Sequence, residues 1–130
     1  MSEALDPEVV ELATKIFDLA RQGRTEELVA YVDAGVPIDA RGVDAGTALH
    51  YAGMWGHPGT LRLLLDRGAE GDRINDRGQT PLAGAVFKGE TEVIKALLEG
   101  GADPAAGTPS AVDTARMFGK AELLDLFGAH

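Results

Sequence analysis

The chain has 130 residues, 45% of them hydrophobic and 25% charged, which is typical of one soluble globular domain. Its net charge of −9 argues against nucleic acid and anionic membranes as partners, because both require a cationic face, and favours a basic or neutral partner. The sequence has no cysteine, no apolar run of the roughly 20 residues needed to cross a bilayer, and no segment that resembles a signal peptide. We therefore expect a cytoplasmic protein.

The first predicted element is a helix that begins at residue 7. Asp6-Pro7-Glu8 combines an N-cap, a proline suited to the first helical turn and an acid near the positive end of the helix. Gly23 is expected to end this helix, and Thr25 to begin the next one. Apolar residues at helical spacing give the first helix one apolar face: Leu12, Ile16 and Leu19.

Three further helix starts follow along the chain, at His57-Pro58, at Thr91 and at Ser110. Leucines and other apolar residues recur at matching positions behind them: Leu61, Leu64, Leu65, Ile94, Leu97, Leu98, Leu123, Leu124 and Phe127. Such spacing places them on one face of each helix. A helix pair with one apolar face cannot bury it alone, so neighbouring pairs are predicted to stack.

The sequence repeats itself with a period of 33 residues. Thr47–Ala52 falls on Thr80–Ala85, and the glycines at 23, 56 and 89 coincide. The last interval is only 30 residues, from Gly89 to Gly119, and the missing residues fall between Ala102 and Ser110. We therefore expect the connection before the last helix pair to be truncated.

These segments resemble the ankyrin repeat, most clearly at Thr47–Ala52 with Gly56-His57, at Asn75–Leu82 and at Gly101–Pro104. The resemblance implies an all-α solenoid of about four stacked helix-turn-helix units with short hairpin fingers between them. We place a single ankyrin-repeat domain at residues 1–130. Its repeats are expected at about 6–40, 41–73 and 74–105, with a shortened cap at 106–128.

Several positions depart from the family pattern. Ala45 replaces the turn glycine of the second repeat, although Gly46 follows it, and Ala83 replaces the usual histidine of the third repeat. Gly53 stands where alanine is usual, and Gly84 also falls inside a short helix. Each helical glycine costs about 1 kcal/mol relative to alanine, which predicts a close helix approach at these two positions.

No residue pattern indicates catalysis, and we expect no catalytic residue, metal or cofactor. Ser110 reads as a helix cap, not as a nucleophile. His50 and His57 suggest a metal site only with Asp44 as a third ligand, and a structural role is favoured for both. In the family, the first of these histidines orients the fingers by hydrogen bonding. The segment Gly42–Gly46 lacks the lysine of a phosphate-binding loop.

The resemblance implies that a partner protein binds at the fingertips and at the ends of the inner helices. The two residues before each mid-repeat glycine define a row: Arg21, Gln22, Met54, Trp55, Phe87, Lys88, Met117 and Phe118. Finger residues are added to this candidate site: Val43, Asp44, Gly46, Asp76, Arg77 and Gln79. Trp55 is expected to be exposed, whereas Met54, Phe87, Met117 and Phe118 could be either exposed or packed between repeats.

The favoured function is a non-catalytic protein-binding scaffold, natural or engineered, that is monomeric. One alternative is a cytosolic accessory or inhibitor subunit that regulates an enzyme through the same surface. A hydrolase using His50 or His57 and a dimer formed through Trp55 are further alternatives. The sequence does not identify the partner.

Overall fold

A computed structural model describes residues 7–42 and 44–129, which form eight α-helices in four successive pairs. Their bounds are α1 Pro7–Gln22, α2 Thr25–Asp33, α3 Ala48–Met54, α4 Pro58–Asp66, α5 Pro81–Lys88, α6 Thr91–Glu99, α7 Ala111–Met117 and α8 Ala121–Leu126. The predicted all-α solenoid is confirmed. Val43, His130 and the predicted N-cap Asp6 lie outside the described residues.

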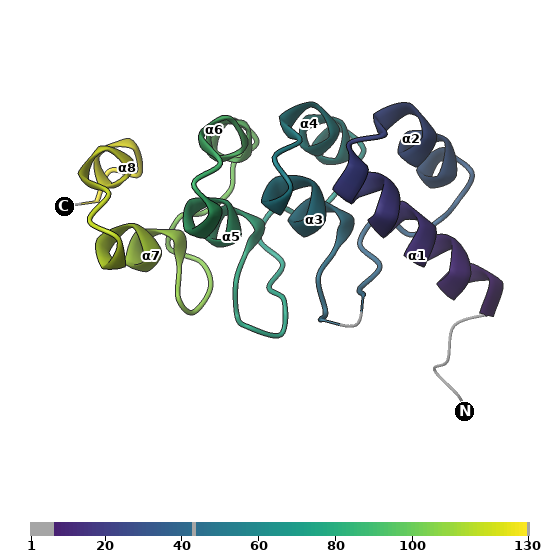
Figure 1. Ribbon diagram of the computed structural model, residues 1–130, viewed down its shortest axis with the longest axis horizontal. Helices are drawn as coiled ribbons and strands as arrows, with labels where there is room; N and C mark the ends of the chain where they lie inside the picture. Colours follow the sequence, from purple (N-terminus) through teal and green to yellow (C-terminus); the bar gives the residue numbers. More distant parts are fainter. Residues whose placement is uncertain (1–6, 43, 130) are drawn as a thin grey trace.

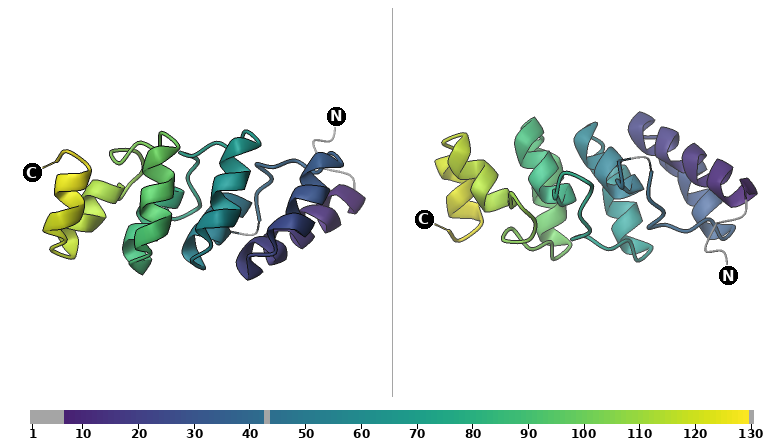
Figure 2. Two further views of the ribbon diagram at one scale, coloured as in Figure 1. Left: turned by 90° about the horizontal axis from the view of Figure 1, so that it is seen from above. Right: turned by 90° about the horizontal axis from the view of Figure 1, so that it is seen from below.

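The helices form two layers (Figures 1 and 2). The inner helices α1, α3, α5 and α7 pack side by side in chain order, and α2, α4 and α6 do the same in the outer layer. Finger-like loops project from the inner layer, away from the outer helices, and the finger before α7 is the shortest of the three (Figure 1). Helix α8 packs on α7 but makes little contact with α6.

The core follows the repeated apolar positions. Leu28, Leu61 and Ile94 are buried at equivalent places in three successive outer helices. Burying one such side chain contributes about 1.5–3 kcal/mol, so a single buried leucine per repeat does much to hold neighbouring pairs together. In the last pair, Leu124 and Phe127 are only partly buried, because that pair has a neighbour on one side only.

Side-chain caps fix the starts of the inner helices. The Thr80 hydroxyl accepts a hydrogen bond from the backbone N–H of Ala83 at 3.1 Å. The Ser110 hydroxyl accepts one from the N–H of Asp113 at 3.0 Å. The Asp113 carboxylate in turn accepts a longer hydrogen bond, of 3.5 Å, from the N–H of Ser110. The predicted cap at Ser110 is confirmed, and its hydroxyl is committed to it.

Each fingertip needs a residue in the left-handed backbone region. In the second finger this residue is Gly78, with φ of 76°, and Asn75 closes the turn by accepting hydrogen bonds from the N–H groups of Arg77 and Gln79. In the first finger, Ala45 stands at the equivalent position with φ of 60°. A side chain with a Cβ atom is strained there.

Replacing Ala45 with glycine is expected to raise the free energy of unfolding by about 1 kcal/mol, because glycine removes the left-handed strain at a smaller entropic cost. Reversible thermal unfolding measures this as a rise of a few degrees in the midpoint. Ala105→Gly is the matched control, since Ala105 is an exposed finger residue without a positive φ. Equal destabilisation by both changes would contradict the expectation.

A Cβ atom at either helical glycine would make only ordinary van der Waals contacts, so the predicted close helix approach is not found. A Cβ atom on Gly53 would stand 3.4 Å from Val93 Cγ1 and 3.5 Å from Leu61 Cδ1. A Cβ atom on Gly84 would stand 3.4 Å from Cγ of Met54. The half-buried side chain of Met54 lies beside Gly84.

Candidate functional site

The predicted row lies on the surface of the stack. We call Arg21, Gln22, Met54, Trp55, Phe87, Lys88, Met117 and Phe118 the Trp55 row. Trp55 is 61% exposed, Phe87 55%, Met117 69% and Phe118 48%. Of the apolar members whose burial the sequence left open, only Met54 is partly packed inside.

The inner helices bring this row together. Trp55 caps the C-terminal end of α3, Phe87 lies in the last turn of α5 and Phe118 caps α7. Because these helices pack side by side, their C-terminal ends align along the stack. The Phe87 and Phe118 rings meet edge to face with centroids 5.7 Å apart, which connects the last two repeats across the surface.

The depth of each row residue depends on the next repeat. Arg21 lies over the ring of Tyr51, 4.3 Å from its centroid, and Met54 lies against Gly84. Tyr51 and Gly84 are equivalent positions in successive repeats, and Thr114 follows them in the last one. Both Arg21 and Met54 are half-buried against the next repeat. Beside the repeat with Thr114, Phe87 stays exposed.

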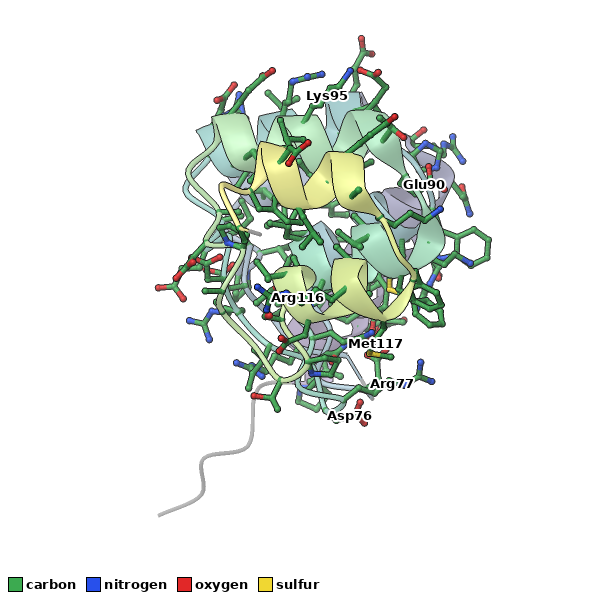
Figure 3. The ribbon with its side chains drawn as sticks, turned by 90° about the vertical axis from the view of Figure 1, so that its left-hand side faces the viewer. Asp76, Arg77, Glu90, Lys95, Arg116 and Met117 are labelled. Atoms are coloured by element: carbon green, nitrogen blue, oxygen red, sulfur yellow. The ribbon has the colours of Figure 1, made fainter. Side chains whose placement is uncertain are left out.

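The fingertips face the same side as part of the row. Seen along the stack, Met117, Asp76 and Arg77 lie on the lower side, whereas Lys95 lies on the outer helices (Figure 3). Asp76 and Arg77 are exposed. This side of the stack therefore presents apolar and charged groups together.

The other predicted finger residues are less available. Gly46 is buried, so its assignment to an exposed contact surface needs correction; its N–H is held by the Asp44 carboxylate at 2.9 Å. Asp44 also accepts a hydrogen bond from the Tyr51 hydroxyl. Burial raises the pKa of Asp44, but these hydrogen bonds outweigh it and hold the pKa below its ordinary value. Gln79 is half-buried, and Val43 lies outside the described residues.

His50 joins a helix to the following finger. The imidazole is 1% exposed, and its Nδ1 accepts a hydrogen bond from the N–H of Thr47 at 3.1 Å. Its Nε2 lies 2.9 Å from the carbonyl oxygen of Gln79 and donates to it. Burial lowers the pKa of His50, so the neutral imidazole is favoured. The finger-orienting role that the resemblance implies matches these contacts.

Stability is expected to fall as the pH drops below about 6.5, the ordinary pKa of histidine. The pKa of His50 is lower in the folded protein, so in this window the unfolded chain binds a proton that the folded chain does not. For one proton, the free energy of unfolding changes by at most about 1.4 kcal/mol per pH unit. Urea unfolding at pH 5 to 8 measures it, and a slope unchanged in His50→Gln would contradict this origin.

His57, in the loop between α3 and α4, has a comparable structural role toward the preceding repeat. Its Nε2 lies 2.7 Å from the carbonyl oxygen of Arg21. Its ring fills the space over Gly23, where a Cβ atom would come within 2.5 Å of Nδ1. The ring therefore packs the second repeat against the first.

The geometry gives no support to hydrolytic or metal chemistry. The hydroxyl of Thr47 is 3.0 Å from Nδ1 of His50, but both groups are buried where no substrate can reach them. In the described ranges, no group of three or more His, Asp or Glu side chains could hold a metal ion. A search of the same residues finds no helix long and apolar enough to span a membrane.

Comparison with known proteins decides the family. A family model described as ankyrin repeats (3 copies) matches residues 16–107. The chain belongs to the ankyrin-repeat family. The helix pairs within residues 16–107 are ankyrin repeats. The ankyrin-repeat domain of human ASB11 superposes with a TM-score of 0.64 at 30% identity, over 68% of this chain and 40% of that one.

Ankyrin-repeat relatives differ widely in their names. Serine/threonine-protein kinase 12 of Arabidopsis thaliana is 38% identical over 112 residues, which cover 85% of this chain and 24% of the kinase. Protein PhlB of Serratia liquefaciens is 43% identical over 82 residues, which cover 60% of this chain and 35% of PhlB. The chain thus spans between a quarter and about a third of the length of these two relatives.

Proposed function

We propose that this ankyrin-repeat protein is a non-catalytic scaffold that binds a partner protein through the Trp55 row and the adjoining fingertips. Ankyrin repeats generally mediate protein–protein interaction. The observation that supports this particular surface is the exposure of Trp55 together with Phe87, Met117 and Phe118. Contiguous exposed apolar groups of this kind mark interaction sites.

The composition of the row strengthens the proposal. The only tryptophan, two of the four phenylalanines and two of the three methionines of the chain fall in it. Aromatic residues, methionine and arginine are enriched at interfaces, and tryptophan is a frequent centre of binding energy. Burying one large apolar side chain contributes about 1.5–3 kcal/mol, which is available to whatever covers the row.

The remaining aspects of the proposal rest on charge and on the occupied imidazoles. We assign no catalytic residue and no cofactor, because both well-placed histidines are committed to backbone carbonyls. The net charge of −9 favours a protein partner over nucleic acid or membrane. A cytoplasmic, monomeric protein, acting as a scaffold or as a regulatory subunit of an enzyme, would use this same surface.

The test is selection from a random peptide display library on three proteins in parallel: the wild type, Trp55→Ala and Leu126→Ala. Leu126 is the matched control, because it is 51% exposed but lies on the outer helix α8. We expect sequences enriched on the wild type to be enriched on Leu126→Ala and lost on Trp55→Ala. Enrichment of the same sequences on Trp55→Ala would contradict the proposal.

A further inference from the structure

The negative charge of the protein is concentrated on the outer helices. Helices α2, α4, α6 and α8 contain eight carboxylates: Glu26, Glu27, Asp33, Asp66, Glu92, Glu99, Glu122 and Asp125. Their only cations are Arg62 and Lys95. Helices α3, α5 and α7, which with their C-caps carry six of the eight residues of the Trp55 row, contain one acid, Asp113, and two cations, Lys88 and Arg116. These three helices are therefore close to neutral in a protein whose net charge is −9.

Two lysines, one in the row and one beside it, form no ion pair within the described part of the chain. Lys88 and Lys120 are exposed, and among the described residues no ion pair includes either of them. By contrast, Lys95 on the outer face lies 3.7 Å from Glu92, and Arg116 lies 4.0 Å from Asp113. The ammonium groups of Lys88 and Lys120 are therefore available to a carboxylate of another molecule.

The repeat pattern leaves a vacant position beside these lysines. The His57 ring fills the space over Gly23, and the Glu90 carboxylate fills the equivalent space over Gly56, where a Cβ atom would stand 2.8 Å from Oε2. Glu90 is thereby directed toward the second repeat. In the next repeat Lys120 occupies the same sequence position, yet nothing lies within 4 Å of the corresponding point over Gly89.

A groove of about 500 Å³ opens at this vacant position. Its lining includes the apolar residues Val86, Ile94 and Leu123, of which Val86 and Ile94 are buried. One cation and one carboxylate, Lys120 and Glu122, also lie on its wall. The groove exists because α8 makes little contact with α6. It adjoins the row, since Val86 precedes Phe87 and Gly119 follows Phe118. A groove of this size accepts large apolar side chains.

We propose that the Trp55 row binds an acidic amphipathic segment of the partner, with an apolar side chain in the groove beside Gly89 and Asp or Glu carboxylates on Lys88 and Lys120. This rests on the proposed function and specifies the partner's chemistry. It reverses the preference for a basic partner that net charge alone suggests. At about 0.15 M ionic strength the Debye length is about 8 Å, so outer-helix carboxylates farther than this from the lysines are largely screened, whereas Glu122 on the groove wall is not.

The test uses the peptides that selection enriches in a Trp55-dependent manner. Each is synthesised twice, once unchanged and once with every Asp and Glu replaced by Asn and Gln, and both are titrated into the wild type, Lys88→Gln/Lys120→Gln and Lys95→Gln. Lys95 is the matched control because it lies on outer helix α6 (Figure 3). We expect the amide peptides to bind the wild type and Lys95→Gln at least about tenfold more weakly, and this difference to shrink in the double variant.

The outcomes separate this inference from the proposed function. Trp55-dependent peptides that carry no net negative charge, or that bind equally well as amides, would overturn the acidic partner and leave the scaffold function standing. Loss of all Trp55 dependence would overturn the scaffold surface itself. A dimer in sedimentation that Trp55→Arg dissociates would show instead that a second copy covers the row.

Discussion

Replacing His50 with alanine is expected to lower the free energy of unfolding by about 3 kcal/mol. The change leaves the buried N–H of Thr47 and the carbonyl of Gln79 without their hydrogen-bond partners, and each such group costs about 1–3 kcal/mol. It also leaves a cavity where a fully buried ring stood. Because the imidazole joins α3 to the next finger, the loss affects two repeats at once.

Urea unfolding of His50→Ala and His57→Ala side by side measures this effect. His57 is only half-buried and has one hydrogen bond, to Arg21, so its replacement is expected to cost about 1 kcal/mol. A cost for His50→Ala no larger than that for His57→Ala would show that the buried network does not hold the first two fingers in place.

Replacing Trp55 with alanine is expected to weaken partner binding by about 2 kcal/mol, which is an approximately 30-fold rise in Kd. The indole is 61% exposed, so it has few contacts to lose within the folded protein, and the melting temperature should change by no more than about 2 °C. Isothermal titration with a selected ligand, combined with thermal unfolding, measures both quantities on one sample.

Leu126→Ala is the control for this prediction, because it removes a similarly exposed apolar side chain from α8. It is expected to leave both Kd and melting temperature nearly unchanged. If Trp55→Ala instead lowers the melting temperature strongly and leaves binding intact, the indole is part of the fold and not of the binding surface.

The sequence predicts the stack well because each repeat contains its own helix-start residues and apolar spacing. The 33-residue period locates the repeats, and a proline or hydroxyl residue marks most helix starts, as Pro58, Pro81 and Ser110 do. Most of the periodic apolar residues are buried or pack against the core, because their spacing alone places them on one helix face. Leu12 is an exception, since it is 38% exposed on α1. These features are local or periodic and need no knowledge of neighbouring side chains.

The depth of the row residues could not be predicted in the same way, because it depends on contacts between repeats. Met54 and Phe87 occupy equivalent positions, but Met54 rests on Gly84 whereas Phe87 adjoins the repeat with Thr114. The groove at Gly89 has a similar origin, since it depends on whether the side chain at position 120 turns inward as His57 does. A single sequence does not contain that choice explicitly.

Net charge describes the surface only coarsely, because it sums over all faces of the protein. The value of −9 reflects mainly the outer helices, whereas the inner helices α3, α5 and α7 are close to neutral. Assigning the charges helix by helix from the repeat register would have revealed this difference. Such an assignment would also have drawn attention to Lys88 and Lys120.

The most direct test of the binding surface is the set of backbone amide resonances that shift when a selected ligand is added to isotopically labelled protein. We expect the shifts to gather at Trp55, Phe87, Lys88, Met117 and Phe118, with the amides of α4 and α6 on the outer face nearly unchanged. Shifts that gather on the outer helices and spare Trp55 would contradict a partner site on the inner side of the stack.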